Sequence, residues 1–199
     1  MDPPATRRLF VAVDPTEAAV AHLGAVVDGL RVSQANQPGH STRLAARENW
    51  HVTLAFLGDV PVDRTDRVRT ALDRAVSGVA PMPICFAGGG TFGRGRFTIL
   101  WAGLGGDVLA LRRLAQGVRQ ELRKARVAFD SKGFRPHLTI SRPGARVAPE
   151  QVADDVAVLG DYVGPQWTVE AVHLFVSETV SSPTGPKPSY PMLSSHPLG

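Results

Sequence analysis

The sequence predicts a fold that mixes helices and strands and arranges them as two similar lobes around one cleft. First, the order strand, capped helix, histidine-bearing strand, helix and strand runs through roughly residues 9–86 and recurs through roughly residues 97–177. Second, the segments His51–Gly58 and His137–Gly144 align within this order without a gap. Two copies are too few for a solenoid. We therefore expect a single bilobal domain over residues 1–199, with an approximate two-fold axis between its halves.

The first half begins with a short apolar strand at Leu9–Val13. Asp14 is expected to cap the helix that follows, because Pro15 suits the first turn and Glu17 lies three residues beyond the cap. A loop is expected from Ser33 to Arg47. The other elements expected in this half are a strand at 51–57, a helix at 62–76 and a short strand at 84–86.

The second half repeats this order after Gly88–Gly90, which is expected to loosen the backbone and is not followed by the lysine of a P-loop. Its clearest helix follows Asp107, a good capping residue, and has apolar residues every three or four positions. Around that helix we expect strands at 97–102, 137–141 and 169–178 and a weaker helix at 150–159. Residues 181–199 form a tail rich in proline and serine, which Tyr190 and Leu193 would anchor to the body.

The composition is that of an ordinary globular chain of 199 residues, with 43% hydrophobic and 20% charged residues. The single cysteine, Cys85, excludes an internal disulfide and a cysteine-based zinc site, and it favours a reducing, cytoplasmic setting. No run of 18 apolar residues is present, so we expect no membrane span. The net charge of +4 is compatible with a nucleic-acid partner.

The two histidine segments predict an acid–base site. Residues i and i+2 of a strand point to the same face, so His51 shares a face with Thr53 and His137 with Thr139. If the lobes face each other, one cleft receives two imidazoles and two hydroxyls. One imidazole can then take a proton from water while the other protonates a leaving ribose oxygen, which is the chemistry that opens a cyclic phosphodiester. The hydroxyls can donate to the non-bridging phosphate oxygens.

Arg142 follows the second histidine by five residues and is a natural further phosphate ligand, because guanidinium binds phosphate in a bidentate manner. Its charge is expected to lower the pKa of both imidazoles. A metal site is the competing interpretation of the two histidines. Zinc would need a third protein ligand and supporting carboxylates, and neither triplet has an acidic residue on its strand face, so we expect no metal.

Two segments, Glu48–Gly58 and Phe134–Arg142, resemble the paired signatures of the two-histidine phosphoesterases. More narrowly, they resemble those of the LigT-like RNA 2′,3′-cyclic phosphodiesterases, formerly named 2′-5′ RNA ligases. The resemblance runs along nearly the whole chain. Supporting stretches are the first strand at Leu9–Val13, the arginine-bearing turn Phe92–Arg96 before Leu100 and Trp101, and the closing segment Gly185–Pro186 with Tyr190.

This resemblance implies an α+β fold in which two antiparallel sheets line a central cleft and the helices lie outside. It implies hydrolysis of an RNA 2′,3′-cyclic phosphate to a 2′-phosphomonoester, with no metal or other cofactor. By motif, His51 matches the proton donor to the leaving 3′-oxygen and His137 matches the base that activates water. Thr53, Thr139 and Arg142 match phosphate contacts. Two departures, Gly95 in the middle turn and a longer stretch between Pro186 and Tyr190, bear on substrate length and base preference rather than on the chemistry.

Basic residues that flank the histidine strands are candidates for an RNA funnel at the cleft mouth, foremost Arg43 and Arg135 and then Arg47, Lys132 and Arg146. Phe10 is a candidate for stacking on a base. By contrast, strand alternation turns Phe56 away from His51 and favours a place in the core. The other histidines are expected on a surface helix (His22), in loops (His40 and His196) and at a structural position (His173).

The sequence therefore favours a monomeric, cytoplasmic enzyme that acts on RNA ending in a 2′,3′-cyclic phosphate, such as tRNA fragments, or on small cyclic nucleotides. One alternative keeps the fold and changes the reaction, to another cyclic phosphate, such as that of ADP-ribose, or to 2′-5′ ligation. Another alternative is an RNA-end-binding module without turnover. Two titrating groups in matching positions favour the enzyme, because a binder would not need them.

Overall fold

The computed structural model describes residues 5–37, 40–183 and 185–199, and it has an α+β architecture with two four-stranded sheets. The first sheet has the order β10 (Met192–Pro197), β7 (Ala171–Val176), β1 (Thr6–Val13) and β2 (Val52–Pro61). The second has the order β5 (Leu138–Ser141), β4 (Ile99–Gly106), β3 (Met82–Phe92) and β6 (Val163–Val169). Every neighbouring pair is antiparallel, as the family resemblance implies.

The chain crosses between the sheets several times. β1 and β2 occupy the same places in the first sheet as β4 and β5 in the second. The third strand is exchanged, because β3 joins the second sheet beside β4 and β7 joins the first beside β1. Each sheet therefore combines strands from the earlier and the later part of the chain, which ties the two sheets into one body.

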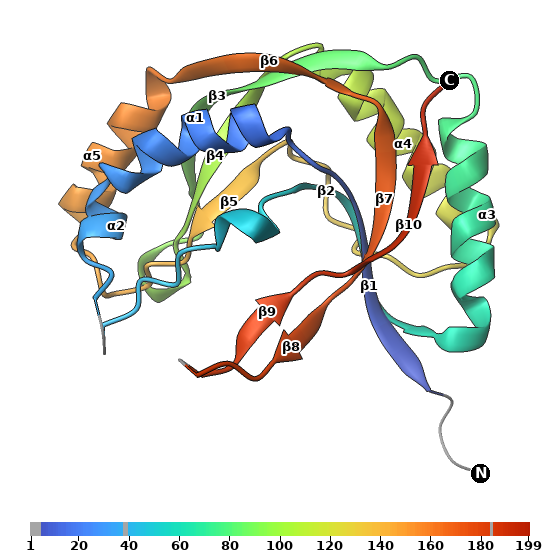
Figure 1. The fold of residues 1–199 in the computed structure, drawn as a ribbon, viewed down its shortest axis with the longest axis horizontal. Helices are drawn as coiled ribbons and strands as arrows, with labels where there is room; N and C mark the ends of the chain where they lie inside the picture. Colours follow the sequence, from blue (N-terminus) through green and yellow to red (C-terminus); the bar gives the residue numbers. More distant parts are fainter. Residues whose placement is uncertain (1–4, 38–39, 184) are drawn as a thin grey trace.

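The helices cover the sheets from outside, as Figure 1 shows. On one side, α1 (Glu17–Asp28), α2 (Arg31–Gln34) and α5 (Pro149–Gly160) pack around the second sheet. On the other, α3 (Thr65–Val76) and α4 (Val108–Lys124) pack together against the first. Both α3 and α4 bury one stripe of apolar residues, which is why they form amphipathic helices on a sheet face. No helix in the described part of the chain is long and apolar enough to cross a membrane.

The helix ends agree with the sequence for α4 and differ from it for α1. The side chain of Asp107 accepts a hydrogen bond from the amide of Ala110 at 2.9 Å and caps α4. The cap of α1 is Thr16, whose hydroxyl accepts from the amide of Ala19, and not Asp14 as predicted. The helix starts later because Thr16 has extended backbone angles, so Asp14 lies before the cap and is half-buried.

The expected loop from Ser33 to Arg47 contains a short helical turn at each end and is otherwise irregular. The turns are the end of α2 and the start of a 3₁₀ turn, η1 (Arg47–Asn49), and residues 38–39 lie outside the described residues. Two further 3₁₀ turns are η2 (Val62–Arg64), which leads into α3, and η3 (Gly95–Phe97), which precedes β4.

The glycine run Gly88–Gly90 lies inside β3, which is longer than the predicted strand. A Cβ at Gly89 would approach the side chain of Leu159 on α5 to 2.5 Å, and one at Gly90 would approach the ring of Trp101 to 2.7 Å. These glycines therefore let α5 and the neighbouring strand pack closely, rather than loosening the backbone.

The end of the chain is more ordered than the predicted tail. Instead of one strand at 169–178, the chain forms the end of β6, then β7, and then β8 (Glu178–Val180), which pairs with β9 (Lys187–Ser189). β10 then adds to the edge of the first sheet. His196, expected in a loop, is on β10 and 3% exposed, with hydrogen bonds to Asp73 and Ser194. Tyr190 and Leu193 pack against the body, as predicted.

Candidate functional site

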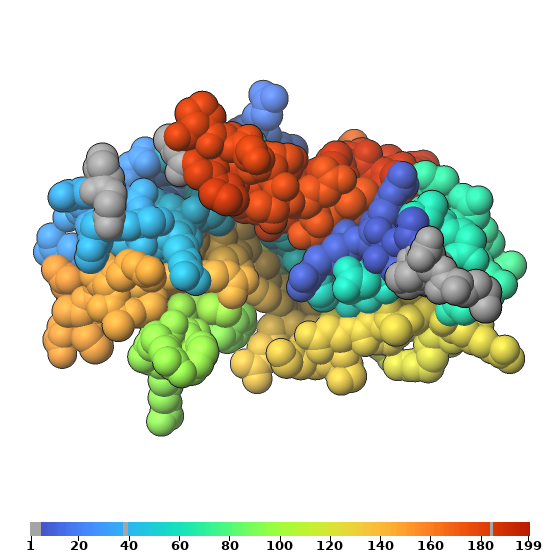
Figure 2. Space-filling view, turned by 90° about the horizontal axis from the view of Figure 1, so that it is seen from below, coloured from blue at the N-terminus to red at the C-terminus, as the bar shows by residue number. Residues whose placement is uncertain are grey.

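A cleft of about 1030 Å³ lies between the two sheets and contains both histidine triplets. His51 immediately precedes β2 of the first sheet, and His137 immediately precedes β5 of the second. Thr53, Thr139 and Arg142 line the same cleft. Figure 2 shows the hollowed face, with the β8–β9 segment on one side of it. The structure thus brings all five predicted residues into one site.

The two imidazoles are held in the same way. Nδ1 of His51 lies 2.8 Å from the carbonyl oxygen of Asn49, and Nδ1 of His137 lies 2.7 Å from that of Arg135. A carbonyl oxygen can only accept, so each Nδ1 carries a hydrogen and donates it. The proton that each ring gains or loses is therefore on Nε2, which is the atom required for acid–base chemistry.

A β-bulge follows each triplet, at the residue after its threonine. In the pairing of β1 with β2, Ala12 faces Thr53 and Val11 faces Ala55, so Leu54 is the extra residue. In the pairing of β4 with β5, Ile140 is extra in the same way. Both extra residues are fully buried. A bulge re-aims the side chains beside it, and its occurrence at matching positions shows that the two triplets have the same local geometry.

Burial lowers the pKa of both imidazoles below the ordinary value of 6.5, because it disfavours the charged form. The carbonyl hydrogen bonds oppose this effect, since they stabilise the protonated ring. A nearby positive charge lowers each pKa further. For His137 that charge is Arg142, as expected from the sequence, but for His51 it is His137 and not Arg142.

Aromatic rings surround His51. Its ring centroid lies 4.7 Å from that of Phe10 and 5.4 Å from that of Tyr190, which meets it edge-on. Phe10 is 3% exposed and also packs against Phe175. It forms part of the cleft wall but does not present a free face to a base, so the prediction that Phe10 stacks on RNA is not supported. Its contact with His51 indicates a role in placing the imidazole.

His137 has a similar aromatic neighbour. The ring of Phe92 on β3 meets it edge-on, with centroids 4.8 Å apart. The guanidinium carbon of Arg135 lies 5.5 Å from the centroid of the same phenyl ring. Arg135 lines a second hollow, which adjoins the cleft at His137, rather than the cleft itself.

Arg43 lies beside Arg142 because the segment before the first triplet pairs with the edge of β5. The amide of Arg142 donates to the carbonyl of Arg43 at 3.2 Å, and the amide of Ala45 donates to that of Ile140 at 2.8 Å. The buried hydroxyl of Ser141 donates to the carbonyl of Thr42. Arg43 has a φ of 54°, a left-handed conformation that few arginine residues adopt, and it lines the cleft as predicted.

The three other basic residues that flank the histidine strands lie in different places. Lys132 lines the cleft. Arg47 forms an ion pair with Asp28 and lines a separate hollow behind His51. Arg146 is not among the residues that line the cleft.

The prediction that Phe56 lies in the core, away from His51, is wrong. The bulge at Leu54 reverses the alternation of β2, so Phe56 pairs with Phe10 and lies on the cleft face together with Thr53. Sequence reasoning also did not assign Asp130, Lys187 and Tyr190 to the cleft. For Tyr190, its place in the closing segment was an available signal.

The other histidines lie outside the cleft. His22 is exposed on α1, as expected, with Nδ1 2.9 Å from the hydroxyl of Tyr162. His40 is exposed, and its Nε2 lies 3.2 Å from the carbonyl of Arg146. His173 is half-buried on β7, and burial lowers its pKa. Among the described residues, no group of three or more histidine, cysteine or acidic side chains could hold a metal ion.

The chain is similar to known proteins over most of its length. The model of the 2'-5' RNA ligase superfamily matches residues 10–180. An RNA 2′,3′-cyclic phosphodiesterase of Archaeoglobus fulgidus is 31% identical over 183 residues, which cover 90% of this chain and 94% of that protein. One of Geobacillus stearothermophilus is 36% identical over 105 residues, which cover 52% of this chain and one third of that protein.

The fold is similar to that of solved structures. The crystal structure of E. coli LigT complexed with 3'-AMP superposes with a TM-score of 0.72 and 19% sequence identity, covering 98% of this chain and 99% of that one. The matched segment of the superfamily model includes both histidine triplets and most of the chain. The chain therefore belongs to the 2'-5' RNA ligase superfamily.

Proposed function

We propose that this protein hydrolyses RNA 2′,3′-cyclic phosphate ends to 2′-phosphomonoesters by acid–base catalysis with His51 and His137, without a metal. The observation that carries the proposal is the matched pair of Nδ1 hydrogen bonds, which leaves Nε2 of both rings for proton transfer in one cleft. The name RNA 2',3'-cyclic phosphodiesterase, shared by the Archaeoglobus and Geobacillus relatives, supports the choice of substrate.

In this mechanism His137 is the base and His51 is the acid. Nε2 of neutral His137 takes a proton from water as the water oxygen attacks phosphorus. The bond from phosphorus to the ribose 3′-oxygen breaks, and Nε2–H of protonated His51 gives its proton to that oxygen. The product keeps its phosphate on the 2′-oxygen. Negative charge grows on the non-bridging oxygens, where Thr53, Thr139 and Arg142 can donate hydrogen bonds.

The substrate partner in this proposal is an RNA end, such as that of a tRNA fragment, and the enzyme acts as a cytoplasmic monomer. Arg43 and Lys132 at the cleft would attract the phosphates of such an end. The two matching triplets, each with its own bulge, support a domain built from two related halves over residues 9–86 and 97–177.

The test is to incubate the protein with an RNA oligomer that ends in a 2′,3′-cyclic phosphate and to determine the position of the phosphate in the product. Exclusive formation of a 2′-phosphate is expected. A 3′-phosphate would contradict the assigned roles. Joining of two oligomers would favour 2′-5′ ligation, turnover of small cyclic phosphates alone would favour a different substrate, and binding without turnover would favour an RNA-end-binding module.

A further inference from the structure

The positive charge of this protein is concentrated on α4. This helix contains five basic residues and one acidic residue, a surplus of four, and the formal net charge of the whole chain is also +4. The acidic residue, Glu121, is paired with Lys124. The rest of the chain is therefore neutral on balance, and α4 is a surface of net positive charge that would attract an anionic partner.

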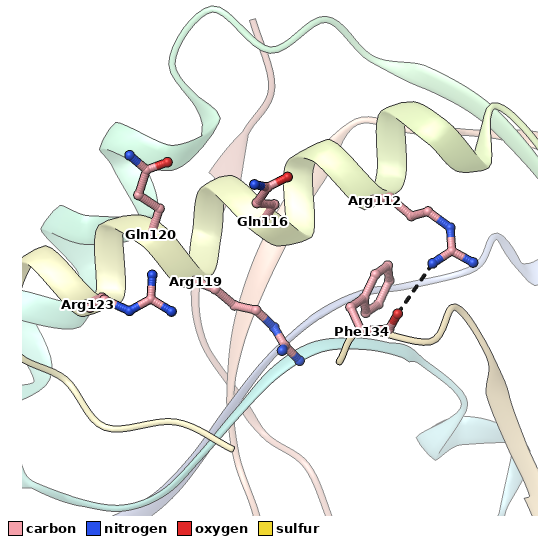
Figure 3. Close-up of a pocket in the computed structure, with 6 residues that line it drawn as sticks. All are labelled: Arg112, Gln116, Arg119, Gln120, Arg123 and Phe134. Atoms are coloured by element: carbon pink, nitrogen blue, oxygen red, sulfur yellow. Dashed lines mark hydrogen bonds between the residues drawn. The ribbon is translucent and has the colours of Figure 1, made fainter. Parts of the chain in front are cut away.

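The exposed side of α4 forms a shallow groove of about 410 Å³. Figure 3 shows its lining residues along the helix, with Phe134 facing it from the segment before β5. The lining consists of Arg112, Gln116, Arg119, Gln120, Arg123 and Phe134. From Arg112 to Arg123 the helix rises about 16 Å at 1.5 Å per residue, enough to face more than one phosphate of a nucleic-acid chain.

The three arginines of the groove have different surroundings. The guanidinium of Arg119 already donates hydrogen bonds within the protein, to the carbonyls of Leu54 and Lys132. Arg112 makes one long hydrogen bond, 3.4 Å to the carbonyl of Phe134, and keeps its other donors. The guanidinium of Arg123 has no hydrogen bond or ion pair within the described segments, and its carbon lies 5.6 Å from the ring centroid of Phe129. Arg112 and Arg123 thus have donors for an external anion.

Two hollows lie between the groove and the catalytic cleft, and each shares lining residues with the next. Arg112 and Phe134 also line a neighbouring hollow together with Phe92, Trp101 and Arg135. From there, Phe134 and Phe92 line the hollow that contains His137. A chain that leaves the cleft would therefore first meet aromatic rings together with Arg135 and Arg119, and then Arg112 and Arg123 of the groove. The hollow that contains His137 also contains one acidic residue, Asp130. Its Oδ2 lies 3.9 Å from Nζ of Lys132, with which it forms an ion pair.

We infer that the groove on α4 binds the phosphates of a single-stranded RNA whose cyclic phosphate end occupies the cleft. Aromatic rings followed by a row of arginines are typical of surfaces that bind single strands, where bases stack and phosphates are held by charge. The inference rests on the proposed function, because it assumes that the cleft receives an RNA end. It adds that the enzyme distinguishes an RNA chain from a cyclic mononucleotide by residues far from the histidines.

The test compares Arg112→Gln and Arg123→Gln with Arg113→Gln. Glutamine removes the charge and keeps helix propensity. Arg113 is the matched control, because it is exposed on the same helix but lines neither the groove nor the hollows that connect it to the cleft. Two substrates are used, a uridine 2′,3′-cyclic mononucleotide and a ten-nucleotide oligouridylate that ends in the same group. Binding of the labelled oligomer with a 2′-phosphate end is measured separately by fluorescence anisotropy at several salt concentrations.

Each groove variant should lower kcat/KM for the oligomer about five- to tenfold and weaken its binding equally, while hydrolysis of the mononucleotide changes less than twofold. The slope of log Kd against log salt should fall by about 0.7 per lost phosphate contact. Arg113→Gln should leave all values near those of the unaltered protein.

Equal effects on both substrates, no effect on either, or an equal loss in Arg113→Gln would overturn the inference. So would a blunt RNA duplex that binds as tightly as the single strand and responds to the same variants. If the unaltered protein hydrolyses neither substrate, the proposed function fails, but the anisotropy measurements still decide whether the groove binds RNA.

Discussion

The imidazole of His51 packs against the ring of Phe10, with centroids 4.7 Å apart and planes inclined by 33°. Phe10 is 3% exposed, so this contact shields one side of the imidazole from water. Burial is the main reason that the pKa of His51 is lowered. The aromatic wall of the cleft therefore controls both the position and the protonation of the proposed acid.

Phe10→Leu should raise the pKa of His51, because a smaller side chain admits water beside the ring. The alkaline limb of kcat/KM, which reports loss of the proton from His51, should move to higher pH. The free energy of unfolding should fall by about 1–3 kcal/mol, as for other core truncations. Phe97→Leu is the control, because Phe97 is 68% exposed and outside the cleft. An unchanged alkaline limb in Phe10→Leu would argue against this role.

His51→Ala and His137→Ala should each lower turnover by roughly 10²- to 10⁴-fold, the usual cost of removing a general acid or base. The double variant should be little worse than either single one, because the two groups act as a unit. Urea unfolding should show that both variants remain folded. His22→Ala, which alters an exposed histidine on α1, should retain full activity. Near-normal turnover by either cleft variant would rule out the two-histidine mechanism.

Activity should survive prolonged treatment with EDTA. Among the described residues, no third histidine, cysteine or acidic side chain joins His51 and His137 in a metal-binding group, and two histidines alone make a poor metal site. The measurement is the rate of hydrolysis of a cyclic-phosphate oligomer before and after chelation. A loss of rate that one divalent ion restores would contradict the proposal that catalysis is metal-free.

The internal repeat in the sequence is enough to predict that the two histidine triplets lie in one site. His51 and His137 were found because the same triplet occurs in the same place of two similar halves, and the family resemblance fixed the fold. What sequence could not show was the local backbone. Phe56 was placed in the core because strand alternation was assumed, and a single extra residue, Leu54, reverses that alternation.

The other errors have a similar cause. His196 was assigned to a loop because its surroundings are rich in proline and serine, yet β10 has a free sheet edge to join and the ring finds Asp73 on α3. Phe10 is predicted to stack on a base because the sequence of a short apolar strand does not show which of its side chains are covered by other parts of the chain. In both cases a contact with a distant part of the chain decides the outcome, and no local pattern encodes it.

Asp14→Asn should make the protein more stable at pH 8 than it is with the natural residue. Burial raises the pKa of Asp14 from 3.8 to about 6, so the folded state holds this proton more tightly than the unfolded state does. The contribution of the Asp14 carboxyl to the free energy of unfolding is fully present below pH 4 and is lost as the pH rises through 6. The variant's gain should be near zero at pH 4 and clearly positive at pH 8, although solvent around the partly exposed carboxyl keeps it below the full effect of the pKa shift. Urea unfolding at the two pH values measures it.

Asp63→Asn is the control for this experiment, because Asp63 is exposed in the turn before α3. Its unfolding free energy should follow that of the unaltered protein at both pH values. A gain for Asp14→Asn that is the same at pH 4 and pH 8 would show that the carboxyl is not the titrating group.

The pH dependence of catalysis should distinguish the role of His137 from that of His51, because Arg142 lowers the pKa of His137 alone. In the proposed mechanism His137 must be neutral and His51 protonated, so kcat/KM should follow a bell whose limbs are macroscopic pKa values of the pair. Both pKa values are lowered, so the bell should lie to the acid side of one built from ordinary imidazoles. A bound phosphate anion favours the protonated rings, so the limbs of kcat should lie at higher pH than those of kcat/KM.

Arg142→Gln should move the acid limb to higher pH, because Arg142 lowers the pKa of His137 and its removal lets that ring keep its proton longer. The alkaline limb should move much less, since the charge that acts on His51 is that of His137. The loss of a phosphate contact should also lower kcat/KM about 10- to 100-fold at its optimum. Arg146→Gln removes a nearby charge outside the cleft and should leave both limbs in place. Equal displacement of both limbs would contradict this assignment, and a flat profile from pH 5 to 9 in the unaltered protein would end the acid–base proposal itself.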